Sequence, residues 1–110
     1  MAKLKYGAKK DANHGEVVDA LIRFGASVLD ISSLGCGAPD LVVWCRGGWH
    51  LCDVKNRKTG YGRRGLNPRQ QEWAAKWKGG PVTLLYSIDD AKALVEGRLE
   101  LLKQIYGSAK

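Results

Sequence analysis

The sequence predicts a single α/β domain in which helices flank a central mixed β-sheet. The chain has 110 residues, the length of one ordinary domain, with 45% hydrophobic and 26% charged residues. Helix-period and strand-period apolar segments alternate along it, in the expected order α-β-β-β-α-β-α. No apolar run approaches the roughly 18 residues of a membrane span, so no membrane association is expected.

The first helix is expected over Asp11–Phe24, because apolar residues recur there at helical spacing. Asp11 or Asn13 is placed to cap its beginning, and Gly25 is placed to end it. The short apolar run Ser27–Ile31 is expected to form the first strand.

A hairpin is expected next, with strands over Asp40–Arg46 and Trp49–Lys55. Gly47-Gly48 lies between them and is a favoured two-residue turn. A glycine-spaced basic loop then leads to Asn67, which is expected to cap the second long helix.

The second long helix is expected to start at Pro68, a favoured first position, and to end near Lys78. A strand follows over Val82–Tyr86, and a helix capped by Ser87 runs to Glu96. The segment Arg98–Tyr106 is expected to be helical. These elements complete the expected sheet and its flanking helices.

Two aspartates and a lysine interrupt the apolar hairpin. With the turn at Gly47-Gly48, Val42 lies opposite Asp53, and Asp40 lies opposite Lys55. Opposed residues share a face, as do residues two apart, so Asp40, Asp53 and Lys55 converge at one end of one sheet face. The other face is expected to be the apolar one, with Leu41, Val43, Cys45, His50, Cys52 and Val54.

Two carboxylates in a partly buried place repel each other and raise each other's pKa unless a cation lies between them. Mg²⁺ or Mn²⁺ prefers oxygen ligands of this kind. A nearby lysine, Lys55 here, can polarise a metal-bound water or offset charge at a phosphate, as in metal-assisted phosphodiester hydrolysis. The alternative interpretation is a cross-strand Asp–Lys salt bridge with no metal.

The net charge is +7, and its distribution is uneven. Between Val54 and Gln71 the chain has six cations and no acid, and further lysines lie in the first ten residues. This pattern favours a polyanionic partner such as nucleic acid. A basic surface that only aids solubility is the alternative. The six cations are Lys55, Arg57, Lys58, Arg63, Arg64 and Arg69.

Three short motifs together resemble one nuclease family. "GAPD" ends at Asp40, "DVK" spans Asp53–Lys55, and "LNPRQ" spans Leu66–Gln70. This combination resembles the VRR-NUC branch of the PD-(D/E)xK nucleases, which is related to phage and Holliday-junction-type resolvases. The resemblance covers about residues 8–96 and implies a restriction-endonuclease-like core within one domain, 1–110. Asp53 stands where many members have glutamate.

The resemblance also implies roles for individual residues. Asp40 and Asp53 would bind the metal directly beside the Val54 carbonyl, and Glu16 would bind the metal or its water. Lys55 would orient the attacking water, and Gln70 would assist at the scissile phosphate. The charge of the basic loop, rather than the resemblance, predicts the DNA-binding residues: Arg57, Lys58, Tyr61, Arg63, Arg64 and Arg69. Tyr61 could stack on a base or sugar, and an ordinary exposed loop tyrosine is the alternative.

Helical phase supports one of these roles and leaves another open. Gln70 shares a helix face with Trp73 and Trp77, two expected core residues, so it is predicted to point toward the sheet. Glu16 lies on the flank of the apolar face, so its role depends on the resemblance, and a surface glutamate is the alternative. His14 is open between a phosphate contact and a helix-terminus role.

The expected function is a Mg²⁺- or Mn²⁺-dependent DNA endonuclease that selects branched DNA by shape. Contacts to the DNA backbone carry no sequence information, and a two-fold symmetric junction suits a homodimer with two sites. A flap or nicking nuclease is the alternative enzyme, and a non-catalytic nucleic-acid-binding domain is the alternative class. A cytoplasmic location is expected, including the host cytoplasm if the protein is encoded by a phage.

Overall fold

A computed structural model describes residues 11–58, 65–98 and 105–106 of the chain. The described strands form one mixed sheet in the order β1-β2-β3-β4-β5, in which β3 and β4 are parallel and the other neighbours antiparallel. The α/β prediction with a mixed sheet is therefore confirmed. The strands are β1 Ser27–Asp30, β2 Leu41–Cys45, β3 Gly48–Val54, β4 Val82–Leu85 and β5 Ile105–Tyr106, and the helices are α1 His14–Arg23, the 3₁₀ turn η1 Ser32–Leu34, α3 Pro68–Lys76 and α4 Ile88–Glu96.

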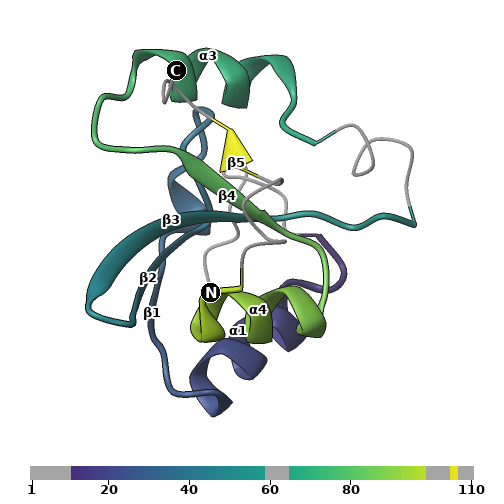
Figure 1. Ribbon diagram of the computed structural model, residues 1–110. Helices are drawn as coiled ribbons and strands as arrows, with labels where there is room; N and C mark the ends of the chain where they lie inside the picture. The colour runs from purple at the N-terminus through teal and green to yellow at the C-terminus, as the bar shows by residue number, and fades with distance from the viewer. Residues whose placement is uncertain (1–10, 59–64, 99–104, 107–110) are drawn as a thin grey trace.

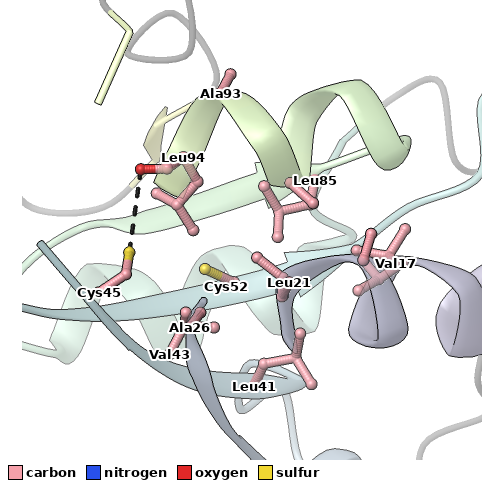
Figure 2. Packing of buried hydrophobic residues seen from close by; sticks show 13 residues of the cluster. Val17, Leu21, Ala26, Leu41, Val43, Cys45, Cys52, Leu85, Ala93 and Leu94 are labelled. Atoms are coloured by element: carbon pink, nitrogen blue, oxygen red, sulfur yellow. Dashed lines mark hydrogen bonds between the residues drawn. The ribbon is translucent and has the colours of Figure 1, made fainter. Parts of the chain in front are cut away.

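Helices cover both faces of the sheet. Figure 1 shows α1 and α4 together on one side and α3 on the other. The main core lies under α1 and α4, where apolar residues of both helices meet the inner face of β2 and β3 (Figure 2). A smaller cluster lies under α3. The main core includes Val17, Leu21, Leu41, Val43, Cys45, Cys52, Val54, Leu85 and Leu94.

The hairpin turn lies one residue earlier than Gly47-Gly48. Arg46 and Gly47 form it, with φ of 52° and 73°, the positive values of a type I′ turn. Leu41 therefore pairs with Cys52, and Trp44 pairs with Trp49 at 4.9 Å between ring centroids. That cross-strand aromatic contact is worth about 0.5–1.5 kcal/mol and offsets the strained arginine. The predicted register is wrong by two residues, which leaves every side chain on its predicted face.

Gly37 fixes the conformation of the loop that precedes β2. Its φ is +86°, and a Cβ there would lie 2.5 Å from the Arg69 carbonyl oxygen. Only glycine allows this close approach at this backbone conformation. The loop before Asp40 is thereby held against the start of α3, which places the two motifs side by side.

Three local predictions are wrong. Ile105–Tyr106 is a strand rather than helix, because it pairs with Val82 and Thr83 and covers the edge of β4. Asn13 is the N-cap residue of α1, but its side chain caps nothing among the described residues and binds strand ends instead. Trp77 is 40% exposed rather than core, since it stacks on the outer side of Trp73.

No helix in the described part of the chain is long and apolar enough to cross a membrane.

Candidate active site

The hairpin brings the two aspartates together at the open end of β2 and β3. Continuing the observed register one pair beyond Leu41 and Cys52 sets Asp40 directly opposite Asp53. Asp40 is 8% exposed and Asp53 is 1% exposed. The corrected register therefore places the two acids closer together than the predicted one did, on the sheet face that α3 covers.

Asp40 is held through one of its two oxygens. Its Oδ2 accepts a hydrogen bond of 3.0 Å from the Val54 amide. Val54 thus contributes its N–H to the site, beside the carbonyl that the sequence resemblance implies as a metal ligand. The bond fixes the carboxylate against β3 and leaves Oδ1 turned away from this contact.

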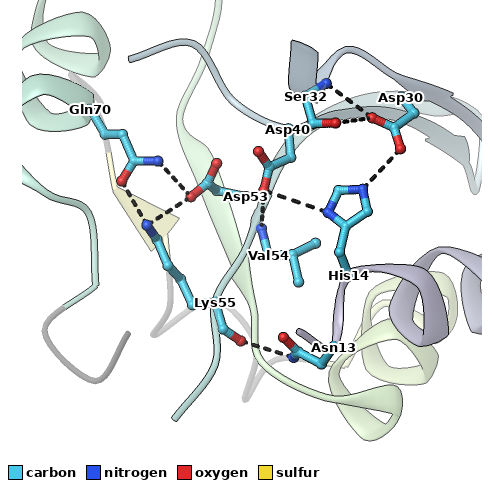
Figure 3. A network of polar contacts seen from close by, with 9 residues as sticks. All are labelled: Asn13, His14, Asp30, Ser32, Asp40, Asp53, Val54, Lys55 and Gln70. Atoms are coloured by element: carbon cyan, nitrogen blue, oxygen red, sulfur yellow. Dashed lines mark hydrogen bonds and ion pairs between the residues drawn. The ribbon is translucent and has the colours of Figure 1, made fainter. Parts of the chain in front are cut away.

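Asp53, Lys55 and Gln70 form a closed triangle of polar contacts (Figure 3). Asp53 Oδ2 accepts from Gln70 Nε2 at 3.0 Å and lies 3.2 Å from Lys55 Nζ. Lys55 Nζ in turn donates to Gln70 Oε1 at 2.7 Å. Asp53 Oδ1 is buried and has no hydrogen-bond partner among the described residues. An acceptor left unpaired in such a place destabilises the fold unless a ligand binds it.

The capping box of α3 sets the orientation of Gln70. Asn67 Oδ1 accepts from the Gln70 amide at 2.9 Å, and Gln70 Oε1 accepts from the Asn67 amide at 2.9 Å. Because Oε1 is committed to two donors, the Nε2 end must face Asp53. Gln70 therefore points toward the sheet, as its helical phase predicts.

Electrostatics in the site disfavour two ionised carboxylates. Burial raises the pKa of Asp40 to about 7, and the charge of Asp53 adds to the rise. Burial also raises the pKa of Asp53, opposed by the nearby Lys55 ammonium. One lysine does not balance two ionised buried acids, so a further cation would stabilise the ionised pair.

Asn13 connects the start of α1 to the site. Its Nδ2 donates to the Lys55 carbonyl at 3.0 Å and to the Tyr86 carbonyl at 2.9 Å. These carbonyls lie just beyond the ends of β3 and β4, where the parallel ladder stops. One amide group thus ties three elements together behind Lys55.

His14 is a site residue whose position the sequence leaves open. It is buried at the first turn of α1, with Nε2 at 2.9 Å from Asp30 Oδ2 and Nδ1 at 4.0 Å from Asp40 Oδ2. Asp30 Oδ1 accepts from the amide and hydroxyl of Ser32, at 3.0 and 2.6 Å. Neither helical phase nor residue spacing could locate this contact, because Asp30 lies on the edge strand.

A third carboxylate near the site comes from Asp11 rather than Glu16. Asp11 is half-buried, and its charge adds to the raised pKa of both Asp40 and Asp53. Glu16 is exposed in the first turn of α1 and lines an open groove of about 510 Å³. The structure therefore does not bring Glu16 to the two aspartates.

The expected DNA-binding residues occupy two places. Arg57 and Lys58 line the same groove as Glu16, and the Arg57 guanidinium lies 4.1 Å from the ring centre of Tyr86. Arg69 is exposed in the first turn of α3. Tyr61, Arg63 and Arg64 lie outside the described residues.

Within residues 11–58, 65–98 and 105–106, no three His, Cys, Asp or Glu side chains are arranged as a ready metal site. The fit for a metal therefore depends on the pair Asp40 and Asp53. The pair offers hard oxygen donors, of which Asp53 Oδ1 is unpaired. Mg²⁺ is commonly held by one or two carboxylates and completed by water and substrate phosphate, so this donor set fits it.

Scans of protein-family models, curated proteins and solved structures find no match to this chain.

Proposed function

We propose that this protein is a divalent-metal-dependent DNA endonuclease of the VRR-NUC type, which hydrolyses phosphodiester bonds in branched DNA. The observation that carries the proposal is the buried pair Asp40 and Asp53, with Asp53 Oδ1 unpaired beside an excess of negative charge. A protein that only binds nucleic acid needs cations and gains nothing from two buried acids. The order α1-β1-β2-β3-α3-β4 is also the one expected for this nuclease core.

Asp40 and Asp53 would hold Mg²⁺ or Mn²⁺, which would supply charge stabilisation at the phosphate and a more acidic bound water. Lys55 is fixed by Asp53 and Gln70, so its ammonium is oriented before substrate arrives. In this position it can stabilise the developing charge or orient the attacking water. Gln70 keeps both partners in place through the α3 capping box.

The groove beside the site offers a path for a DNA strand. Its lining includes Arg57 and Lys58, which follow Lys55 directly along the chain. Contacts of these cations to phosphates would lead a strand toward Lys55 without reading its sequence. Selection would then depend on DNA shape, and a homodimer would present two such sites to a four-way junction.

The proposal is tested by incubating the protein with labelled four-way junction, flap, nicked and linear DNA. Each DNA is offered with Mg²⁺, Mn²⁺ or EDTA. We expect cleavage of the junction with either metal, no cleavage in EDTA, and loss of cleavage in Asp40→Asn and Asp53→Asn. Asp19→Asn is the matched control, because Asp19 is an exposed aspartate of α1.

The outcomes separate the alternatives. Preferred cleavage of flaps or nicked duplex would identify a nuclease of that kind in place of a resolvase. Tight DNA binding without cleavage in either metal would identify a non-catalytic binding domain. Full cleavage by Asp40→Asn would remove the carboxylate pair from the reaction.

A further inference from the structure

The groove beside the candidate active site is large enough for one nucleotide. Its volume is about 510 Å³, and binding pockets for small molecules span roughly 300–1,000 Å³. Asn13 on its wall donates to the Lys55 carbonyl (Figure 3), so the groove lies beside the main chain of that lysine. The described residues that line it are Ala12, Asn13, Glu16, Asn56, Arg57, Lys58, Tyr86 and Ser87.

Arg57 presents a planar cation to this groove. Its guanidinium lies over the Tyr86 ring, 4.1 Å from the ring centre, and Tyr86 packs against the apolar cluster under α3. Asn56 Oδ1 accepts from the Lys58 amide at 2.9 Å, which fixes the turn between them. A guanidinium held flat on an aromatic ring can stack a nucleobase on its opposite side, and its edge can still contact a phosphate.

The groove also contains a negative charge. Glu16 is exposed and is the one acid among the described residues that line it. A carboxylate repels a phosphate, so Glu16 does not suit a groove that binds only the DNA backbone. The N–H groups of bases, in contrast, are donors that a carboxylate accepts. The lining thus combines cations for phosphate with an acceptor for a base.

Guanine matches this acceptor best. Its Watson–Crick edge has two adjacent N–H donors, at N1 and N2, which can meet both oxygens of one carboxylate. Cytosine and adenine offer one exocyclic amino group each, and thymine offers a single ring N–H. Reaching that edge requires a base that is neither paired nor stacked, and a branch point or flap supplies such a base at the lowest cost.

We propose that the groove holds one unstacked nucleobase, preferably guanine, which stacks on the Arg57 guanidinium and donates hydrogen bonds to the Glu16 carboxylate. This inference rests on the proposed function, because it describes how the DNA to be cleaved is held beside Lys55. It adds one feature to the substrate, an unpaired nucleotide near the cleaved phosphate. Phosphate contacts alone carry no such preference.

Fluorescence anisotropy of labelled single strands in EDTA tests the pocket without cleavage. Four short strands have an abasic sugar-phosphate backbone, and three of them carry one central base: guanine, hypoxanthine or thymine. We expect guanine to bind roughly 5- to 100-fold tighter than thymine, the range expected of one bidentate base contact. Hypoxanthine lacks the 2-amino group and should lose most of that gain. The strand without a base should bind most weakly, because it has nothing to stack.

Glu16→Gln separates base recognition from general repulsion. Glutamine leaves one acceptor oxygen and sets a donor against guanine, so the guanine preference should disappear, while the thymine strand binds equally or more tightly. Asp19→Asn removes an exposed acid of the same helix and should keep the preference. A Glu16→Gln protein that keeps the preference, or a wild-type protein without one, would overturn the inference. Because EDTA removes metal, a role of Glu16 in metal binding cannot produce the expected result.

Arg57→Lys tests the stacking contact. Lysine keeps the charge and loses the plane, so the advantage of the thymine strand over the strand without a base should shrink roughly 5-fold or more. An undiminished advantage would overturn the stacking role. The salt dependence of binding should be unchanged, because the charge is kept.

The junction cleavage assay in Mg²⁺, run in parallel, separates this inference from the proposed function. Cleavage that depends on Asp40, without any guanine preference in binding, would overturn the inference and keep the proposed function. A guanine preference that depends on Glu16, in a protein that cleaves no DNA, would support the pocket and overturn the proposed function.

Discussion

The two faces of the central hairpin use the same two strands for opposite purposes. Leu41, Cys52 and Val54 face α1 and α4, are fully buried, and bury no charge. Asp53 of β3 and Lys55 just beyond its end alternate with Cys52 and Val54, are buried almost as deeply, and face α3. Burial alone thus does not distinguish core from candidate site. The difference is that one face gains stability from burial, whereas the other loses hydration that only partners or a ligand can replace.

On the polar face, hydrogen-bond partners replace the lost hydration for some side chains and not for others. Lys55 and Gln70 have their hydrogen-bonding groups engaged, while Asp53 keeps one oxygen unpaired. Such a site is unfavourable for the metal-free fold and favourable for binding.

The largest effect is expected from Lys55→Ala. It leaves Asp53 buried without its cation, which costs about 3 kcal/mol of metal-free stability, and lowers cleavage roughly 10²- to 10³-fold. Urea denaturation measures the free energy of unfolding, and single-turnover kinetics measure the cleavage rate. Lys76→Ala is the control, because the Lys76 side chain is 78% exposed and pairs with Glu72 at 3.5 Å on the surface. Equal stability and turnover in Lys55→Ala and wild type would contradict this view of the polar face.

Leu41→Ala tests the apolar face. Leu41 is fully buried, so the substitution should reduce the free energy of unfolding by about 2–5 kcal/mol. Cleavage per folded molecule should change little, because no polar group of the site is removed. Denaturation curves give the stability, and the cleavage rate is divided by the folded fraction at each temperature. A large loss of the normalised rate would show that the two faces are coupled.

Asp40→Asn is expected to stabilise the metal-free protein by about 2 kcal/mol at pH 8. The shift of the Asp40 pKa from 3.8 to about 7 corresponds to roughly 4 kcal/mol at most. Between about pH 4 and 7 the folded state keeps a proton that the unfolded state has released. Wild-type stability should therefore be complete below pH 4 and fall as the pH rises through 7.

Asparagine has no proton to lose, so the variant should lack this decline. Thermal unfolding in EDTA from pH 5 to 8 measures both proteins. Asp19→Asn, the exposed control, should follow wild type. Parallel curves for Asp40→Asn and wild type would show that Asp40 does not titrate in this range.

The smallest effect concerns Arg57 and Lys58. Replacing both by alanine should reduce the slope of log K against log[salt] for duplex DNA by about 2, since two phosphate contacts would be lost. Fluorescence anisotropy in Ca²⁺ measures binding while limiting cleavage. The control replaces Lys76 and Lys92 by alanine, because both lysines are exposed, one on α3 and one on α4. If the control lowers the slope equally, the DNA path does not follow the groove.

Sequence periodicity predicted the faces of the hairpin better than its turn. Alternation with period two assigned Leu41 and Asp53 to opposite faces, and a register error of two residues cannot alter that assignment. The turn itself depended on the Trp44–Trp49 contact across the strands, which outweighed the local preference of Gly47-Gly48. The inward direction of Gln70 followed in the same way from helical phase.

The remaining site residues depend on contacts between distant segments. His14 meets Asp30 and Asp40 only after α1 packs beside the sheet, and no local pattern marks that pairing. Asp11 was expected only as a helix cap, yet its charge reaches the two aspartates. The role implied for Glu16 came from resemblance, and its helical phase already placed it off the apolar face. Spacing along one element locates a face, but not the neighbour that the face will meet.

The two hydrogen bonds of the Asn13 amide have a consequence for how the chain acquires its final form. They reach carbonyls 42 and 73 residues further along the sequence. Contacts of such long range form late, because closing large loops costs entropy before any gain in packing. A chain still on the ribosome that has not yet extended to Tyr86 lacks the partner that closes this end of the molecule. The start of α1 is therefore tied to the ends of β3 and β4, beside Lys55, only after Tyr86 has been synthesised.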